Sequence, residues 1–351
     1  MRAMTWLAIA LGWAVPVATL ANTPIQIAAA DAYKHEPGAV TVPAVLDGLP
    51  RVTAVNIGAT PMVDVGLDYR TPDGREVTTV YIFRQALGSP EVWFDRARLA
   101  IIANRQIGTL QPAPTEMFVL PGARVPNGLR AIHAAEGGPV RSTAVALVPV
   151  DGWMIKLRLS SATLDKDALR GRLERTIAAI GWPSFTKARP RYPMTPCAEP
   201  LNIAKPANPA KLVGDESMAA GMLDALVAGA GAKQPEESEG QATPVRWCRD
   251  AITTGGAGIY RRNEEKDNYI LALGDGSIGM TVGPSLSNLL GKGNKSWSVS
   301  LVQLERQVIF APYDDILQPQ QAVALLQTGK PVSAAATWPK TGAITVIMPP
   351  K

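Results

Sequence analysis

The sequence predicts an α+β protein with two domains, each an antiparallel sheet covered by helices. Its 351 residues suffice for two domains of ordinary size. Segments that alternate apolar and polar residues recur along the chain, and Asp-Gly or Gly-rich turns join them into hairpins. In both halves an amphipathic segment follows the strands, so we expect repeated β-hairpin–helix units. An internal duplication is one explanation, although the residues themselves do not repeat.

Composition and patterning divide the chain into five segments. In order, we expect a signal peptide (1–21), an extended lead-in (22–50), an N-terminal α+β domain (51–185), a Pro-rich linker with a short helix (186–245) and a C-terminal α+β domain (246–351).

The first residues have the pattern of a secretory signal peptide. Arg2 precedes an apolar run over Trp6–Ala18, and a small-residue cleavage site ends at Ala21, with an alternative at Ala30. The run is shorter than the roughly 20 residues that a spanning helix needs. We therefore expect an exported chain, periplasmic or secreted, without a transmembrane span in its mature form.

The N-terminal domain begins with three expected strands, over Val52–Ile57, Met62–Tyr69 and Glu76–Phe83. Pro90 then opens a helix, since proline is favoured at the first helical position. Trp93 and Ala97 lie on the apolar side of this helix, and Asp95 lies among the charged residues that we expect on the other. Strands near Glu116–Leu120 and Leu129–Ala135 follow.

The stretch from residue 142 to residue 182 is the best specified. Thr143–Val148 is apolar throughout, as in a buried strand, and the strand after it alternates from Trp153 onwards. Asp151-Gly152 suits the two-residue type I′ turn between them. Asp165 is the expected N-cap of a helix that ends near Gly181.

This order of elements resembles the PsbP-like α/β/α sandwich. The resemblance covers residues 45–185, and the helix sequence DALRGRLERTIAAIGWP stands in the expected final place. It implies a fold that serves mostly binding and assembly rather than catalysis.

The C-terminal domain repeats the same kind of pattern. We expect strands over Ile259–Arg262, Asn268–Leu273, Ser277–Val282, Trp297–Leu304 and Gln307–Phe310, a helix over Pro319–Gln327 and a closing hairpin over Val332–Met348. In the linker, Asp215–Gly229 is expected to be the short helix.

Cys197 and Cys248 are the only cysteines. In an oxidising compartment an isolated pair is most simply a disulfide. This one would close a loop of roughly 50 residues and stabilise the fold by about 3–4 kcal/mol. It would tie the linker to the second domain.

Charge and motifs exclude several functions. The net charge of +5 is diffuse, with no run of five basic residues, which argues against nucleic acid as a partner. Gly274, Gly276 and Gly279 match the dinucleotide-binding spacing, yet Met280 and Val282 continue as a strand where that motif needs a helix. We therefore expect a Gly-rich hairpin, and neither cofactor nor metal.

The remaining polar residues leave two functional hypotheses. His133 lies in an expected strand and is a weak candidate general base; Ser142, Ser160, Ser161 and Asp151 could join it in a triad, but no Gly-x-Ser-x-Gly elbow occurs. His35 lies in the lead-in and is weaker still. Carboxylates that stand close in sequence are Asp64 and Asp68, Glu264, Glu265 and Asp267, and Asp314 and Asp315, the last two as a capping pair.

The favoured hypothesis is a non-catalytic binding or assembly protein of the cell envelope, whose ligand or envelope-protein partner the sequence does not identify. Its expected contact surfaces are the sheet face that carries Lys156 and Arg158, opposite the helices, and the cleft between the domains. The alternative is a secreted hydrolase with its site between the two domains and His133 as its base.

Overall fold

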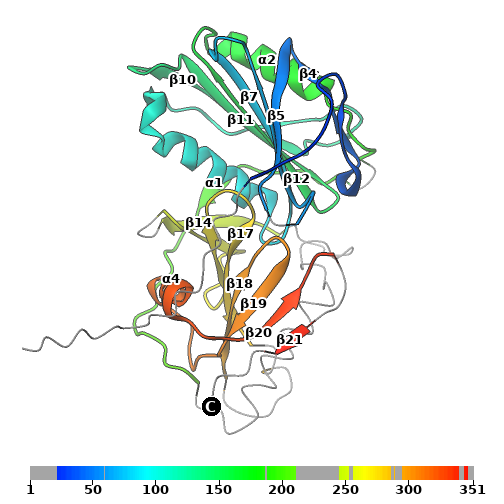
Figure 1. Ribbon diagram of the computed structural model, residues 1–351. Helices are drawn as coiled ribbons and strands as arrows, with labels where there is room; N and C mark the ends of the chain where they lie inside the picture. The colour runs from blue at the N-terminus through cyan, green and yellow to red at the C-terminus, as the bar shows by residue number, and fades with distance from the viewer. Residues whose placement is uncertain are drawn as a thin grey trace, which may run out of the picture.

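The computed structural model describes residues 22–58, 60–185, 188–210, 245–252, 256–285, 288, 295–339 and 344–346. Two large sheets, almost wholly antiparallel, and helices that pack on them confirm the predicted α+β class (Figure 1). The predicted signal peptide and the predicted short helix of the linker lie outside the described residues. No helix of the described part is long and apolar enough to cross a membrane.

The first sheet is wholly antiparallel and contains the three expected N-terminal strands and the predicted hairpin. In spatial order its strands are β1 (Thr23–Pro24), β5 (Leu49–Asn56), β6 (Asp64–Arg70), β7 (Glu76–Arg84), β12 (Trp153–Ser161), β11 (Ser142–Val150), β10 (Gly128–Glu136) and β8 (Thr109–Leu110), with β4 (Val45–Leu46) beside β5 and β9 (Glu116–Phe118) beside β10.

The hairpin of β11 and β12 and the helix after it follow the predicted chemistry. Asp151 and Gly152 have φ angles of 39° and 81°, as a type I′ turn requires. Helix α2 (Lys166–Ala179) is capped by Asp165, whose carboxylate accepts the amide of Ala168 at 2.9 Å.

Helices cover both faces of the first sheet. Leu169, Leu173 and Ile177 of α2 pack on the face that carries Ile155 and Leu157. Helix α1 (Pro90–Ala103) packs on the opposite face, which carries Val145, Leu147 and Met154. The first domain is thus a three-layer arrangement of helix, sheet and helix, while its resemblance to the PsbP-like family remains a prediction.

The expectation of an extended lead-in over 22–50 is wrong. Strands β2 (Tyr33–His35) and β3 (Val40–Val42) form a hairpin around the 3-10 turn η1 (Glu36–Gly38). Tyr33, His35, Val40 and Val42 are buried, and the hydrophobic side chains among them belong to the core of the first domain. The alternation of buried and exposed residues in β2 is too short to be recognised by periodicity.

The second sheet follows chain order. Its strands are β13 (Thr195–Pro196), β14 (Trp247–Ile252), β15 (Gly258–Arg262), β16 (Tyr269–Leu273), β17 (Ile278–Pro284), β18 (Trp297–Val302), β19 (Arg306–Phe310), β20 (Pro331–Ala336) and β21 (Ile344–Val346), and helix α4 (Pro319–Thr328) packs on it. Only β13 runs parallel to its neighbour. The repetition of hairpin–helix units stays a prediction.

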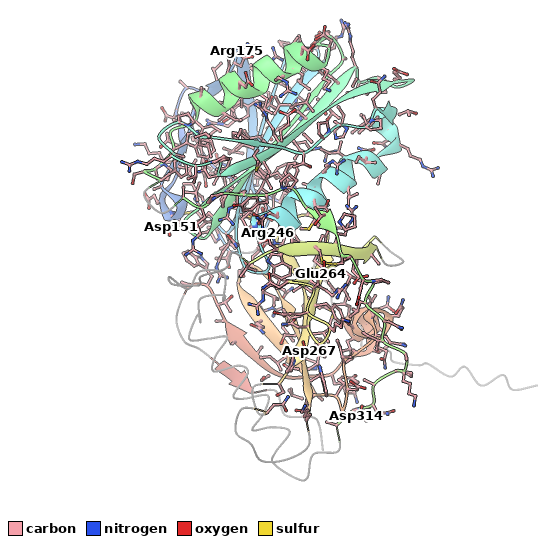
Figure 2. All side chains as sticks on the ribbon, turned by 180° about the vertical axis from the view of Figure 1, so that it is seen from behind. Asp151, Arg175, Arg246, Glu264, Asp267 and Asp314 are labelled. Atoms are coloured by element: carbon pink, nitrogen blue, oxygen red, sulfur yellow. A yellow bond between two sulfur atoms is a disulfide. The ribbon has the colours of Figure 1, made fainter. Side chains whose placement is uncertain are left out.

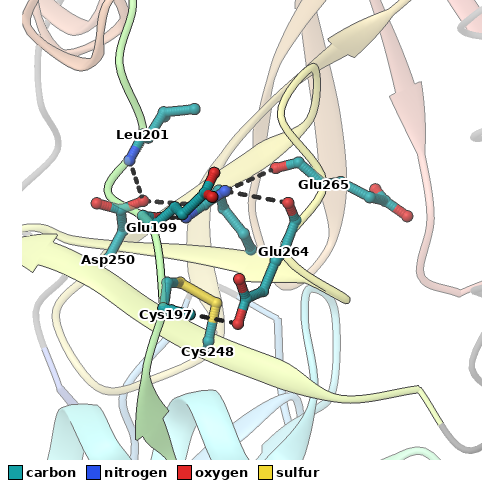
Figure 3. Close-up of a disulfide and its surroundings, with 9 residues drawn as sticks. Cys197, Glu199, Leu201, Cys248, Asp250, Glu264 and Glu265 are labelled. Atoms are coloured by element: carbon teal, nitrogen blue, oxygen red, sulfur yellow. Dashed lines mark hydrogen bonds and ion pairs between the residues drawn. A yellow bond between two sulfur atoms is a disulfide. The ribbon is translucent and has the colours of Figure 1, made fainter.

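The described part of the linker runs along the second domain and is tied there by the predicted disulfide. Cys197 and Cys248 are joined across 51 positions of the chain (Figure 3). Next to the bridge, the buried guanidinium of Arg261 lies 2.7 Å from the carboxylate of Asp250, which also accepts the amide of Leu201 at 2.7 Å. The linker is therefore held to the sheet by a covalent bond and by a hydrogen bond to a carboxylate that forms a buried ion pair within the sheet.

The two domains share one hydrophobic cluster. Helix α1 lies at the lower edge of the first domain, directly against the second sheet (Figure 1). The cluster joins Val92, Trp93, Phe94, Leu147 and Met154 of the first domain to Tyr260, Ile270, Ala272, Val302 and Leu304 of the second.

Candidate binding surface at the domain junction

Part of the sheet face under α1 carries polar side chains. Strand registers place Asp68, Thr79 and Arg158 in one row with Val145, and place Tyr81 and Lys156 in the next row with Leu147. Residues directly opposite each other on neighbouring strands share a face of the sheet. The polar residues therefore lie on the same face as Val145 and Leu147, the apolar residues on which α1 packs. We call the polar part of this face the polar shelf; its members are Asp64, Asp68, Thr79, Tyr81, Lys156 and Arg158.

Lys156 is the buried end of the polar shelf. Its side chain is 7% exposed, and its ammonium donates to the carboxylate of Asp275 at 2.7 Å. The ammonium also lies 4.6 Å from the ring centroid of Tyr81 and 5.4 Å from that of Phe83, so both rings contribute cation–π stabilisation. The prediction that Lys156 belongs to an open contact surface is wrong, because the turn before β17 covers it.

Two carboxyl groups face Lys156 and titrate differently. Burial raises the pKa of Asp64 to about 6, against the opposing effect of the Lys156 charge. Burial also acts to raise the pKa of Asp275, but the charge and the hydrogen bond of Lys156, with smaller effects of Arg158 and Arg96, leave it below its usual value. The junction therefore holds one carboxylate with a strong partner and one that takes up a proton near pH 6.

Arg158 lies on the more open part of the polar shelf. Its side chain is half-buried, and within the described ranges no hydrogen bond or ion pair engages its guanidinium. Its neighbours are already paired, since Arg70 forms an ion pair with Asp68 and Thr79 donates to Asp68 at 3.1 Å. The prediction that this face lies opposite the helices is wrong, because α1 packs on the part of it that carries Val145 and Leu147. Of the two residues predicted to form the contact surface, Arg158 is the more exposed.

Polar contacts and apolar packing fill the junction beside α1. Asp95, 3% exposed, accepts hydrogen bonds from Tyr260 at 2.7 Å and Arg249 at 2.9 Å. Arg96 donates to the carbonyls of Gly274, at 3.0 Å, and Gly256. The supposedly solvated side of α1 thus packs on the second domain, and these residues occupy the position expected for an interdomain cleft.

His133 is buried in the first domain without a catalytic partner among the described residues. Its Nδ1 contacts the carbonyl oxygen of Gln111 at 3.0 Å, and its Nε2 has no partner there. Burial lowers its pKa, and the charged groups that act on it are the cations Arg98 and Lys166. Among the described residues, no carboxylate contacts either ring nitrogen, as the orientation of a catalytic base would require.

Of the other members of the hypothetical triad, Ser160 shares a strand row with His133, but Thr143 stands between them and contacts Ser160 at 3.2 Å. Asp151 is at the far end of the hairpin, toward the second domain (Figure 2). The strand rise of about 3.3 Å per residue puts it roughly 25 Å from the position opposite His133. The hydroxyls of Ser142 and Ser161 donate to Leu164 and Glu76, at 2.8 and 2.7 Å.

His35 has a structural role in the core. The amide of Gly38 donates to its Nδ1 at 3.0 Å, and its Nε2 lies 2.8 Å from the carbonyl of Met62. The ring packs edge-on against Trp153, with centroids 4.5 Å apart. Both ring nitrogens of His35 thus have a partner. Burial lowers the pKa of His35, which favours the neutral form of the ring.

The glycines of the dinucleotide-like motif form a tight turn rather than a phosphate cradle. Gly274 has a φ of 70°, and Gly279 belongs to β17, as predicted. A Cβ at Gly279 would overlap the carbonyl oxygen of Leu271 and lie 2.8 Å from Leu87 of the first domain. The last glycine therefore permits close packing at the domain junction.

Four of the remaining carboxylates have separate local partners, whereas Asp267 is exposed. Glu264 accepts the amide of Ala198 at 3.2 Å and Glu265 binds Arg262 at 2.9 Å, on the second domain marked by Glu264 and Asp267 in Figure 2. Asp314 accepts the amide of Asn208 at 2.8 Å, and Asp315 that of Ile316 at 2.7 Å. They do not cap α4, whose N-cap is Gln318.

A pocket of about 500 Å³ opens elsewhere, on the second domain. It lies between the linker and the start of α4, and its lining includes Leu201, Ile203, Asp250 and Ile259. Asp250 is already committed to Arg261, as described above. Among the described residues, no group of three or more His, Cys, Asp or Glu side chains could hold a metal ion.

Comparison of the chain with protein-family models and with curated proteins finds no match. The geometry of the polar shelf is therefore the main guide to function.

Proposed function

We propose that this chain is an exported, periplasmic or secreted, non-catalytic protein that binds or assembles other components of the cell envelope. Export is supported by the signal-like pattern around Arg2 and Trp6–Ala18 and by the Cys197–Cys248 disulfide, which suits an oxidising compartment.

The half-buried guanidinium of Arg158 carries the proposal for binding. A rigid central strand holds it between β7 and β11, and no acceptor within the described residues uses it. A group of this kind recognises a partner's acceptor without reacting with it. The hydrolase alternative has weaker support, because His133 has cationic rather than carboxylate neighbours.

Site-specific photo-cross-linking in the native host tests this proposal. A photoreactive phenylalanine at Thr79, on the polar shelf, is expected to give a discrete adduct with an envelope component. The same residue at Asp73, on the exposed turn between β6 and β7, is the control and should give none. Failure to obtain an adduct from the shelf, together with hydrolysis of an ester or glycoside from a substrate panel, would overturn the proposal.

A further inference from the structure

Arg158 differs from the other cations at the domain junction. The ammonium of Lys156 is bound by Asp275, Arg96 donates to two carbonyls, and Arg70 pairs with Asp68. Arg158 acts on Asp275 only through its charge, without a hydrogen bond. Its guanidinium thus keeps its hydrogen-bond donors for a group from outside the described residues.

The hydroxyls next to Arg158 have already committed their protons. Thr79 donates to Asp68. Thr143 donates its single hydroxyl proton to the carbonyl of Leu159 at 2.8 Å, so in the 3.2 Å contact between Thr143 and Ser160 the proton comes from Ser160. The guanidinium of Arg158 therefore keeps donors available on this face, which calls for an acceptor ligand.

The charge balance favours a group with one negative charge. Three cations act on Asp275, namely Lys156, Arg158 and Arg96. The Lys156 charge also acts on Asp64. Of the nearby carboxylates, Asp68 is paired with Arg70 and Asp95 with Arg249, so we leave these two pairs out of the balance. Three cations against two carboxylates leave one positive charge, which one carboxylate of a ligand would neutralise.

We propose that Arg158 is the recognition residue of the polar shelf and binds a carboxylate side chain of a partner polypeptide; this inference rests on the proposed binding function. The planar guanidinium pairs with a carboxylate through two parallel hydrogen bonds. The surrounding side chains are half-buried, whereas sites for small ligands enclose most of the ligand's surface. A carboxylate presented by a polypeptide suits such a surface better than a free organic acid.

An acidic peptide tests the chemistry directly. An acetylated hexaglutamate peptide is titrated at constant ionic strength, with hexaglutamine as the neutral control. The Nε–Hε resonance of Arg158, assigned by its loss in Arg158→Gln, is expected to shift saturably with hexaglutamate alone. Binding by fluorescence anisotropy should weaken at least tenfold in Arg158→Gln, less in Arg158→Lys, and less than twofold in Arg75→Gln, which removes an exposed charge from the same domain.

Equal affinity of the wild type and Arg158→Gln for hexaglutamate, or the absence of a saturable shift, would overturn the inference. A larger saturable shift with inorganic phosphate than with the peptide would overturn the choice of a carboxylate. Cross-linking from Thr79 separates this inference from the proposed function. If the Thr79 adduct forms to the same extent in Arg158→Gln, the role of Arg158 is contradicted but the binding function is not. If no adduct forms even with Arg158 present, the binding function itself is contradicted.

Discussion

Lys156 of the first domain and Asp275 of the second form an ion pair, with 2.7 Å between Nζ and Oδ2, that crosses the domain junction. The lysine is buried between two aromatic rings and the aspartate is about one-third exposed. An ammonium held in such a place depends on its partner, because the removal of one member leaves an uncompensated buried charge.

Asp275→Asn is therefore expected to destabilise the protein by about 2–3 kcal/mol, below the full cost of breaking a buried pair because Asp275 is partly exposed. The free energy of unfolding in urea measures this loss. Asp267→Asn, an exposed position of the same domain, is the control and should leave the urea midpoint unchanged. A similar midpoint for both variants would show that the ion pair does not stabilise the junction.

Asp64 makes stability depend on pH. Its pKa of about 6 in the folded protein lies above the unfolded value of about 3.9, so the folded state binds the extra proton. Stability is then lost as pH rises from about 4 to about 6, by up to about 2–3 kcal/mol. Asp64→Asn should remove this loss, as measured by urea unfolding at several pH values across that range. An unchanged pH dependence in Asp64→Asn would contradict the assignment.

The disulfide should stabilise the second domain. Replacing both Cys197 and Cys248 with serine removes a cross-link over 51 positions and is expected to cost about 3–4 kcal/mol. Urea unfolding with and without reductant measures this effect. The double variant serves as its own control, because reductant should not change its urea midpoint. If reductant also leaves the wild-type midpoint unchanged, the disulfide does not stabilise the protein.

Two glycines of the same motif should respond differently to a methyl group. Gly279→Ala forces a Cβ against Leu271 and Leu87 and should cost about 1–3 kcal/mol. Gly276→Ala is the matched control, because a Cβ there meets nothing within 4 Å. Thermal unfolding of the two variants compares them directly. Equal melting temperatures would contradict the close packing of β17 against its neighbours.

Local signals in the sequence predicted much of the fold. The turn at Asp151-Gly152 and the helix cap at Asp165 depend on a few neighbouring residues, and both are confirmed. The buried hairpin of β2 and β3 was missed because strands of three residues carry too little periodicity, and Tyr33 and His35 are buried only through tertiary contacts.

The candidate site depends on contacts that are distant in sequence. Alternation along β12 places Lys156 and Arg158 on one face, which the structure bears out. It cannot tell which of them is covered, since the covering residue Asp275 lies 119 positions after Lys156. The burial of Asp95 against Tyr260, 165 positions away, escaped prediction for the same reason.

Helix α1 has two sets of neighbours, strands β10 and β11 on one side and β14 and β16 on the other. Trp93 and Phe94 belong to a hydrophobic cluster that contains residues of both domains. A substitution at either position therefore disturbs packing in both domains, and compensation requires substitutions in both. The two domains are thus constrained to evolve together. Transfer of either domain alone into another protein would expose its part of the shared hydrophobic cluster to water.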